Sequence, residues 1–235
     1  MGHLIREIAQ ERGHEIVCIV EQRASAGESI PFVTFDSDEF RSADVAIEFT
    51  TPTTAADNIR QAWAQGVPVV SGTTGWPLEE LKGASAHSDK APNGGSLKFI
   101  SEGSSVQVVD EKGKVWLIWK SNFSVGVNVF FELNKMLAQA LAQYKQYTPS
   151  ITETHHIHKL DKPSGTAVTL AEGIHSLLPY SSTPLPLIES IREGEVAGIH
   201  TVTWDSEEDT ITITHSAKSR RGFALGAVLA AEQLL

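Results

Sequence analysis

Short apolar runs alternate with amphipathic segments over the first 75 residues, and this alternation restricts the fold more than any other feature. Leu4, Ile5 and Ile8 recur at helical spacing and predict a helix over residues 2–12, and a second helix is predicted over residues 53–65. Three runs rich in Val and Ile predict buried strands: Glu15–Val20, Asp44–Phe49 and Val67–Val70. Strands that alternate with helices predict a mostly parallel sheet with right-handed crossovers.

The residues at the predicted strand ends indicate a nucleotide site. Open parallel sheets bind ligands beyond the carboxyl ends of their strands. Here those ends are Glu21, Thr50-Thr51-Pro52 and Gly72-Thr73-Thr74-Gly75, whose small and hydroxyl side chains allow close approach of a cofactor. Glu21 lies 19 positions after Gly2, which matches the offset of about 20 residues between a glycine turn and a ribose-binding acid. We therefore predict an α/β Rossmann-like dinucleotide-binding domain.

Two residues of this domain have two interpretations each. Gly2 is either the last glycine of a Gly-x-Gly-x-x-Gly turn or an unrelated residue next to the start. In the first case the opening strand and the other glycines are missing, and with them several N–H groups that hold a pyrophosphate. Arg23 either contacts the 2′-phosphate of NADP or is an ordinary surface charge.

The second half of the chain has a different pattern. A helix over residues 127–145 is followed by a strand over 151–154 and a helix over 166–178. Three further strands and a final helix are expected at 189–191, 200–204, 210–215 and 224–235. This pattern predicts an α+β domain with a mixed or antiparallel open sheet.

The expected domain boundaries follow from this change of pattern. Residues 1–121 and 218–235 are predicted to form the dinucleotide-binding domain, and residues 122–217 the substrate-binding and oligomerisation domain. A stretch rich in Gly, Ser, Lys and Asp reads as an insertion over about 88–114. Within and beside it, Val106–Val109 and Val115–Trp119 predict a hairpin or a surface insertion.

Composition excludes several classes of protein. The chain has a net charge of −10, which argues against a nucleic-acid partner. No apolar run reaches the roughly 18 residues that a membrane span needs, and the single cysteine, Cys18, cannot form an internal disulfide. We expect a cytoplasmic protein without a membrane partner. An anionic ligand would then need a locally basic pocket.

A histidine- and lysine-rich stretch supplies that local charge, and it has three interpretations. His155, His156 and His158 could form a metal site, but neighbouring residues of a strand point to opposite faces and the helical spacing of a typical zinc site is missing. The histidines could be purely structural. The third interpretation, which we favour, is a site that binds an anionic substrate and transfers a proton, because Lys159 and Lys162 add charge and imidazoles titrate near neutral pH.

The turn after these residues adds hydrogen-bond donors. Pro163 fixes the turn, and Ser164, Gly165 and Thr166 present N–H and hydroxyl groups at the start of a predicted helix. A helix N-terminus favours a carboxylate or phosphate.

The same stretch carries a specific resemblance. From Glu153 to Ala167 it reads Glu, one residue, His, three residues, Lys, one residue, Asp, one residue, Pro-Ser-Gly-Thr-Ala. This order resembles the signature of the 4-hydroxy-tetrahydrodipicolinate reductase family. Three further segments resemble that family's cofactor loop, hinge and return crossing, in its order: Gly72–Gly75, Ser121–Asn128 and Ser219–Ala224.

The resemblance implies roles for individual residues. His155 would be the general acid, and Lys159 would hold or polarise the substrate. It implies substrate carboxylate binding by His156, Lys159, Gly165 and Thr166, to which the helix-start argument adds Ser164. The cofactor residues expected from the resemblance and the strand ends together are Gly2, Glu21, Arg23, Thr50, Gly72, Thr74, Ser121, Asn122 and Phe123. The family implies NADH or NADPH as cofactor, a small dicarboxylate substrate and a homotetramer built through the second domain's sheet. From the histidine spacing we expect no metal.

The sequence departs from the family pattern in three places. The first strand with most of the glycine turn is missing, the segment from Gly75 to Ser121 is long, and the chain stops at Leu235 before a short expected tail. These departures leave one alternative to an active lysine-pathway reductase: a truncated or degenerate relative that folds but binds cofactor poorly.

Overall fold

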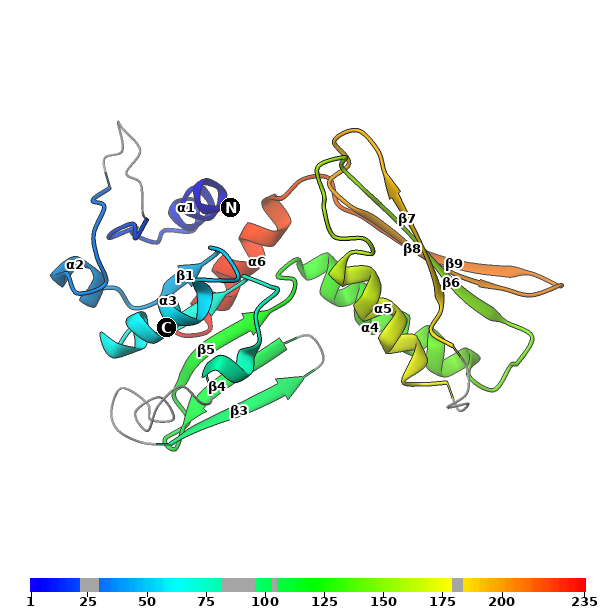
Figure 1. Ribbon diagram of the computed structural model, residues 1–235, viewed down its shortest axis with the longest axis horizontal. Helices are drawn as coiled ribbons and strands as arrows, with labels where there is room; N and C mark the ends of the chain where they lie inside the picture. The colour runs from blue at the N-terminus through cyan, green and yellow to red at the C-terminus, as the bar shows by residue number, and fades with distance from the viewer. Residues whose placement is uncertain (22–29, 82–95, 103–104, 179–183) are drawn as a thin grey trace. The chain divides into compact units, whose positions relative to one another are not determined.

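The computed structural model describes residues 1–21, 30–81, 96–102, 105–178 and 184–235. The chain divides into two compact units. The first consists of Met1–Phe123 with Phe223–Leu235, and the second of Ser124–Gly222. Each unit has its own sheet (Figure 1). Among the described residues, no helix combines the length and the apolar character that crossing a bilayer requires.

The first unit contains a five-stranded sheet of order β1-β2-β5-β4-β3. Its strands are β1 (Ala46–Glu48), β2 (Val69–Ser71), β3 (Leu97–Glu102), β4 (Ser105–Asp110) and β5 (Val115–Lys120). β1, β2 and β5 are parallel, whereas β3 and β4 are antiparallel to their neighbours. The helices are α1 (Gly2–Glu11), α2 (Asp38–Arg41), α3 (Ala55–Ala64), the short 3₁₀ helix η1 (Leu78–Leu81) and α6 (Arg221–Glu232), which begins two residues before the unit does.

Three apolar clusters of described residues hold this unit together, one of which packs α6 against the sheet through Ala227, Val70 and Ile118. α3 packs Ile59 and Trp63 against sheet residues such as Val69 and Leu117. α1 and α6 meet through a separate cluster that includes Ile8 and Val228. The amphipathic spacing that predicted α1 and α3 therefore buries one face of each helix, as expected for an α/β domain.

One strand expected in the first unit is not formed. Among the residues that the structure describes, the run Glu15–Val20 forms no regular strand, and Ile19 alone pairs, in an isolated bridge with Phe32. The segment beside it contains Pro31, which accepts a hydrogen bond from Ile19 but has no N–H to extend the ladder. Of the two alternatives for Val106–Val109 and Val115–Trp119, the hairpin is confirmed: β4 and β5 pair antiparallel, and β5 is a buried central strand. The composition of that stretch also gave no sign of β3, most of whose side chains are exposed.

The second unit has a four-stranded sheet of order β7-β6-β8-β9. The strands are β6 (Thr148–His155), β7 (Leu187–Arg192), β8 (Ile199–Asp205) and β9 (Thr210–Ser216). β6 and β7 are parallel and the other pairs antiparallel, so the expected mixed sheet is confirmed. The helices α4 (Val125–Leu141) and α5 (Gly165–His175) lie along one face of this sheet (Figure 1).

The two faces of this sheet differ in composition. The helix-covered face buries Ile151, Val202 and Trp204 against α4 and α5. Because side chains alternate along a strand, the opposite face carries the intervening residues, which are mostly threonines such as Thr201 and Thr203. The polar residues Glu153 and His155 lie on the covered face, where burial makes their partners decisive.

Candidate active site

A buried carboxylate and an imidazole form the centre of the second unit's polar cluster. Glu153 and His155 are two residues apart on β6, so both side chains point to the helix-covered face. Glu153 is completely buried and His155 is 8% exposed. Glu153 Oε2 and His155 Nδ1 form an ion-pair contact. A carboxylate at Nδ1 fixes the orientation of the ring and leaves Nε2 as the atom that can exchange a proton.

Glu153 also connects two other elements. Its Oε1 lies 3.0 Å from Nη2 of Arg192, the last residue of β7, and accepts a hydrogen bond of 3.3 Å from the backbone N–H of Ser164. Burial by itself would raise the pKa of Glu153, but hydrogen bonds from Ser190 and Arg192 and the charge of His155 lower it to about 2. Glu153 is therefore a fully ionised acceptor at neutral pH.

His155 experiences opposing effects. Burial lowers its pKa below the ordinary 6.5, the Glu153 carboxylate opposes that shift, and the Lys159 charge adds to it. The net direction is downward. A lowered pKa makes the imidazolium a stronger acid, so protonated His155 gives up its proton more readily.

A second histidine lies against the first. His200 on β8 pairs in register with Glu153, and its ring centroid is 5.0 Å from that of His155 in an edge-on arrangement. Its Nε2 lies 3.2 Å from Ser164 Oγ. Burial and the neighbouring His155 lower the pKa of His200 to about 4, so that this imidazole is neutral at physiological pH.

Glu153, His155 and His200 offer ligand atoms within 4.8 Å of one another, which is the geometry of a small metal site. The surroundings argue against a cation, because the Arg192 guanidinium already pairs with Glu153 and Lys159 lies near enough to lower the pKa of His155. The three-histidine metal site considered from the sequence is not assembled: His155 is buried with Glu153, whereas His158 is exposed and pairs with Glu195 at 3.1 Å.

The lysine-bearing loop lies next to this centre. Lys159 Nζ is 2.8 Å from Asp161 Oδ1, and the Lys159 side chain is 23% exposed. The backbone oxygens of Lys159 and Asp161 accept hydrogen bonds from Arg192 at 3.3 and 2.6 Å. The cluster is thus less positive than the sequence predicted, because Glu153, Asp161 and Glu195 balance much of its charge.

α5 begins at this loop. Ser164 is its N-cap, and Ser164 Oγ accepts a 3.3 Å hydrogen bond from the Ala167 N–H. The first turn then presents Gly165, which is exposed, and Thr166, which is half-buried. His156 lies near the return segment, with its Nε2 3.3 Å from Nη2 of Arg220. All the residues predicted to bind substrate carboxylates therefore belong to β6, the lysine loop and the start of α5.

The first unit gathers several of the predicted cofactor residues at one sheet edge. The register aligns Glu48 with Ser71 and Ser71 with Trp119, so β1, β2 and β5 end together. The residues that follow these strands include Thr50, Gly72 and Ser121. This is the edge at which open α/β sheets bind ligands.

A buried glutamate organises these loops, and sequence reasoning missed it. Glu48 Oε1 accepts hydrogen bonds of 2.8 Å from the Thr50 N–H and from Thr73 Oγ1, and Glu48 Oε2 accepts one of 2.5 Å from Ser71 Oγ. Thr50 N–H is also 2.9 Å from Thr73 Oγ1. The strand-end loops are therefore held to each other before any ligand binds.

The Phe49 ring packs behind these loops, between Gly72 and Phe123. A Cβ at Gly72 would overlap Phe49 Cε1, so any larger residue there would require the Phe49 ring to move. The Phe49 ring lies 6.0 Å from that of Phe123, which is buried together with Asn122. The structure thus brings Thr50, Gly72 and the Asn122–Phe123 segment into one region, with Thr74 exposed beside them.

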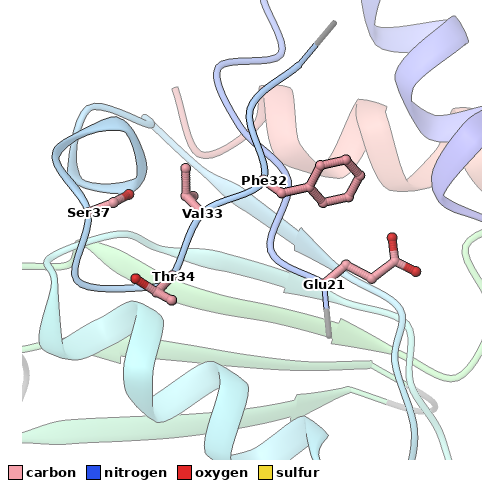
Figure 2. Close-up of a pocket in the computed structure, with 5 residues that line it drawn as sticks. All are labelled: Glu21, Phe32, Val33, Thr34 and Ser37. Carbon is pink, nitrogen blue, oxygen red and sulfur yellow. The ribbon is translucent and has the colours of Figure 1, made fainter. Parts of the chain in front are cut away.

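Two more predicted cofactor residues belong to other segments of the first unit, Glu21 to the segment after Ile19 and Gly2 to α1. Glu21 lines an open pocket of about 410 Å³ together with Phe32–Thr34 and Ser37 (Figure 2). Gly2 is the first residue of α1, where its backbone is exposed. Arg23 lies outside the described residues.

The functional candidates missed from sequence are Glu48, Glu153, Arg192 and His200. Glu153 was quoted as part of a motif but received no role, although its i, i+2 spacing to His155 places both on one face. Arg192 and His200 reach the site only through strand pairing, to β6 in each case.

Comparison with known proteins places this arrangement in a family. Profiles described as the N-terminus and the C-terminus of dihydrodipicolinate reductase match residues 1–93 and 126–235. A curated 4-hydroxy-tetrahydrodipicolinate reductase of Christiangramia forsetii is 39% identical over 100% of this chain and 88% of its own length. This chain belongs to the dihydrodipicolinate reductase family.

Other members support the same assignment. A 4-hydroxy-tetrahydrodipicolinate reductase of Archaeoglobus fulgidus is 36% identical over 81% of this chain and 69% of its own length. The solved dipicolinate-bound dihydrodipicolinate reductase from Paenisporosarcina sp. TG-14 has a TM-score of 0.69 and covers 99% of this chain and 89% of its own. At 20% identity, that likeness confirms the fold of a dihydrodipicolinate reductase.

Proposed function

We propose that this chain reduces 4-hydroxy-tetrahydrodipicolinate to tetrahydrodipicolinate with NADH or NADPH, in the synthesis of lysine and diaminopimelate. The observation that carries the proposal is the buried Glu153–His155 pair beside Lys159 and the start of α5, in a chain whose curated full-length relative bears that activity. Nothing in the comparisons favours the alternative of an inactive relative.

His155 acts as the general acid. Its Nδ1 faces Glu153, so Nε2 is the atom that donates a proton to the substrate position where negative charge accumulates. General acid catalysis of this kind contributes roughly 10²- to 10⁴-fold in rate. In the overall reaction the substrate hydroxyl leaves as water, one hydride is added and one proton is consumed.

Lys159 and the start of α5 bind the substrate carboxylates. Lys159 exchanges its Asp161 partner for a carboxylate, and the backbone donors of Gly165 and Thr166 receive the other. His156 and Ser164 complete this anion site. Orientation of the ring by two anchored carboxylates brings the reacting atoms into place.

The cofactor belongs at the edge where β1, β2 and β5 end. The residues there fit a nucleotide, because the Glu48 network presets the Thr50 and Gly72 loops and glycine at position 72 leaves the loop without a side chain. When bound, the reduced nicotinamide supplies the hydride. Glu21 accepts hydrogen bonds from ribose hydroxyls, while Ser121, Asn122, Phe123, Thr74, Gly2 and Arg23 line the rest of the site.

We also propose that the protein is a cytoplasmic homotetramer assembled through the second unit's sheet. The support is the sheet face opposite α4 and α5, whose threonine-rich surface is half-buried or exposed in the single chain.

The activity is tested by substitution at the two central residues. His155→Gln keeps a polar side chain but removes the titrating group, so kcat should fall about 10²- to 10⁴-fold while KM changes little. Lys159→Ala should lower kcat and raise KM together. The measurement is the substrate-dependent loss of NADH absorbance.

Two outcomes would contradict these roles. An unchanged kcat in His155→Gln removes it as the acid, and an unchanged KM in Lys159→Ala removes it from the carboxylate site. Titration of NADH fluorescence on the purified wild-type chain separates an active reductase from the alternative that cannot hold cofactor.

A further inference from the structure

Arg192 joins parts of the second unit that are distant in sequence. Its Nη2 contacts Glu153 Oε1 at 3.0 Å and the backbone oxygen of Asp161 at 2.6 Å. Its Nε donates to the backbone oxygen of Lys159 at 3.3 Å. The side chain is only 14% exposed. One guanidinium at the end of β7 thus holds both the carboxylate under His155 and the loop that carries Lys159.

Glu153 on β6 accepts contacts from several elements at once. With Arg192 on Oε1 and His155 on Oε2, its two oxygens serve the cation and the imidazole separately. The Ser164 N–H, at the start of α5, also donates to Oε1. A completely buried, ionised carboxylate requires such partners, because an isolated buried charge is strongly destabilising.

We infer that Arg192 and Glu153 are positioning residues, which together set the distance and orientation between the proton donor His155 and the loop of Lys159. The inference rests on the proposed function and extends it to two residues that need not touch the substrate. Arginine suits this task better than lysine, because its planar fork can bond a carboxylate and two backbone oxygens at once, whereas an ammonium acts as a point charge.

The pair also sets the charge around His155. Glu153 on the same strand favours the imidazolium, whereas Lys159 in the loop and Arg192 on β7 disfavour it. His200 on β8 faces the ring as well, with His215 on β9 beyond it, and both have a lowered pKa. Removal of Glu153 and removal of Arg192 should therefore shift the titration of His155 in opposite directions.

Three variants test the inference. Arg192→Lys keeps the positive charge that Glu153 needs but loses the fork, so kcat should fall about 10- to 100-fold and KM for the dicarboxylate should rise. Glu153→Gln should move the descending limb of the kcat/KM profile to lower pH, and Arg192→Gln should move it to higher pH. Arg41→Lys is the matched control, because Arg41 forms an exposed pair with Asp38 in the first unit.

A measurement without turnover accompanies the kinetics. In ¹⁵N-histidine-labelled protein, the His155 Nδ1–H held by Glu153 should give a far-downfield proton resonance. It should be present in the wild type and in Arg41→Lys, and it should be lost in Glu153→Gln. Circular dichroism and thermal melting establish that each variant is folded. If Arg192→Gln does not fold, the kcat and KM of Arg192→Lys test the role of Arg192.

The outcomes separate this inference from the proposed function. A wild-type chain that binds NADH but does not reduce the substrate contradicts the proposed function. An active wild type whose Arg192→Lys variant keeps its kcat and KM overturns the inference. So does a set in which Glu153→Gln and Arg192→Gln shift the pH profile in the same direction, or in which the downfield resonance survives in Glu153→Gln.

Discussion

At the scale of single residues, the site depends on a histidine held between opposing influences. Burial removes water from His155 and disfavours its charged form, while Glu153 restores part of the stability of that form. Glycine at position 198 makes room for the ring: its φ is +146°, and a Cβ there would be 3.1 Å from His155 Nε2. Small changes around this ring are therefore expected to affect proton transfer.

Gly198→Ala tests this requirement. The added methyl group would crowd Nε2 and impose a backbone conformation that side chains rarely adopt, so kcat should fall at least tenfold, with a stability loss of about 1–3 kcal/mol. Steady-state kinetics and thermal melting measure the two effects. Gly113→Ala is the control, because Gly113 also has a positive φ of 84° but nothing within 4 Å of a Cβ. Equal loss of activity in both variants would contradict the crowding argument.

His200 predicts a pH dependence of stability. Its pKa in the folded chain is about 4, below the ordinary 6.5, so the unfolded chain binds more protons between these values. The contribution of His200 to the free energy of unfolding is therefore fully present above pH 6.5. It decreases by about 3 kcal/mol as the pH falls toward 4. The buried His155 and the half-buried His215 act in the same direction.

His200→Gln should flatten this dependence. Glutamine does not titrate and can still bond Ser164 Oγ, so the free energy of unfolding should fall less between pH 7 and pH 4.5 than in the wild type. Urea unfolding followed by circular dichroism at several pH values measures it. Parallel curves for the two proteins would show that His200 does not account for the acid sensitivity.

How far the sequence could predict these residues depends on spacing along the chain. His155, Lys159 and Ser164 lie within ten residues, so their local motif was visible. Arg192 is 39 residues from Glu153 and becomes its partner only through the register of β6 with β7. The sequence of one strand does not determine its register with a neighbouring strand. For the same reason, the position of His200 on β8 opposite Glu153 could not be predicted.

At the scale of elements, α5 shows how a helix start becomes part of the site. Ser164 caps the helix and also contacts Glu153 and His200. Through these contacts, Ser164 holds the first turn of α5 against the polar cluster on the sheet. The long amphipathic helices were predictable because their periodicity is local, whereas Glu15–Val20 was not, because a strand needs a partner.

Ser164→Ala should affect stability and binding together. Loss of the cap costs about 1 kcal/mol, and a looser first turn should raise KM for the dicarboxylate several-fold. The comparison variant is Ser176→Ala at the other end of the same helix, where the exposed hydroxyl donates to the Gly173 oxygen. Denaturant unfolding and KM measure the outcome. An unchanged KM in Ser164→Ala would mean that the helix start does not hold the substrate.

At the scale of the whole molecule, each unit supplies one part of the proposed chemistry. The first unit has the strand-end loops held by Glu48, and the second has the cluster around Glu153. Two buried carboxylates thus organise two separate sets of loops. The sheet face opposite α4 and α5 is the surface proposed for subunit assembly.

Thr201→Lys tests the assembly proposed for that face. Thr201 lies on the central strand β8 and is half-buried, with its Oγ1 3.1 Å from Thr214 Oγ1 on β9. Sheets that stack face to face lie about 10 Å apart, so a lysine here would place an unpaired charge inside the interface. Sedimentation should give a tetramer for the wild type and smaller species for the variant. Gln10→Lys adds the same charge on the exposed side of α1 and should remain tetrameric. A Thr201→Lys variant of wild-type mass would place the subunit interface on another surface.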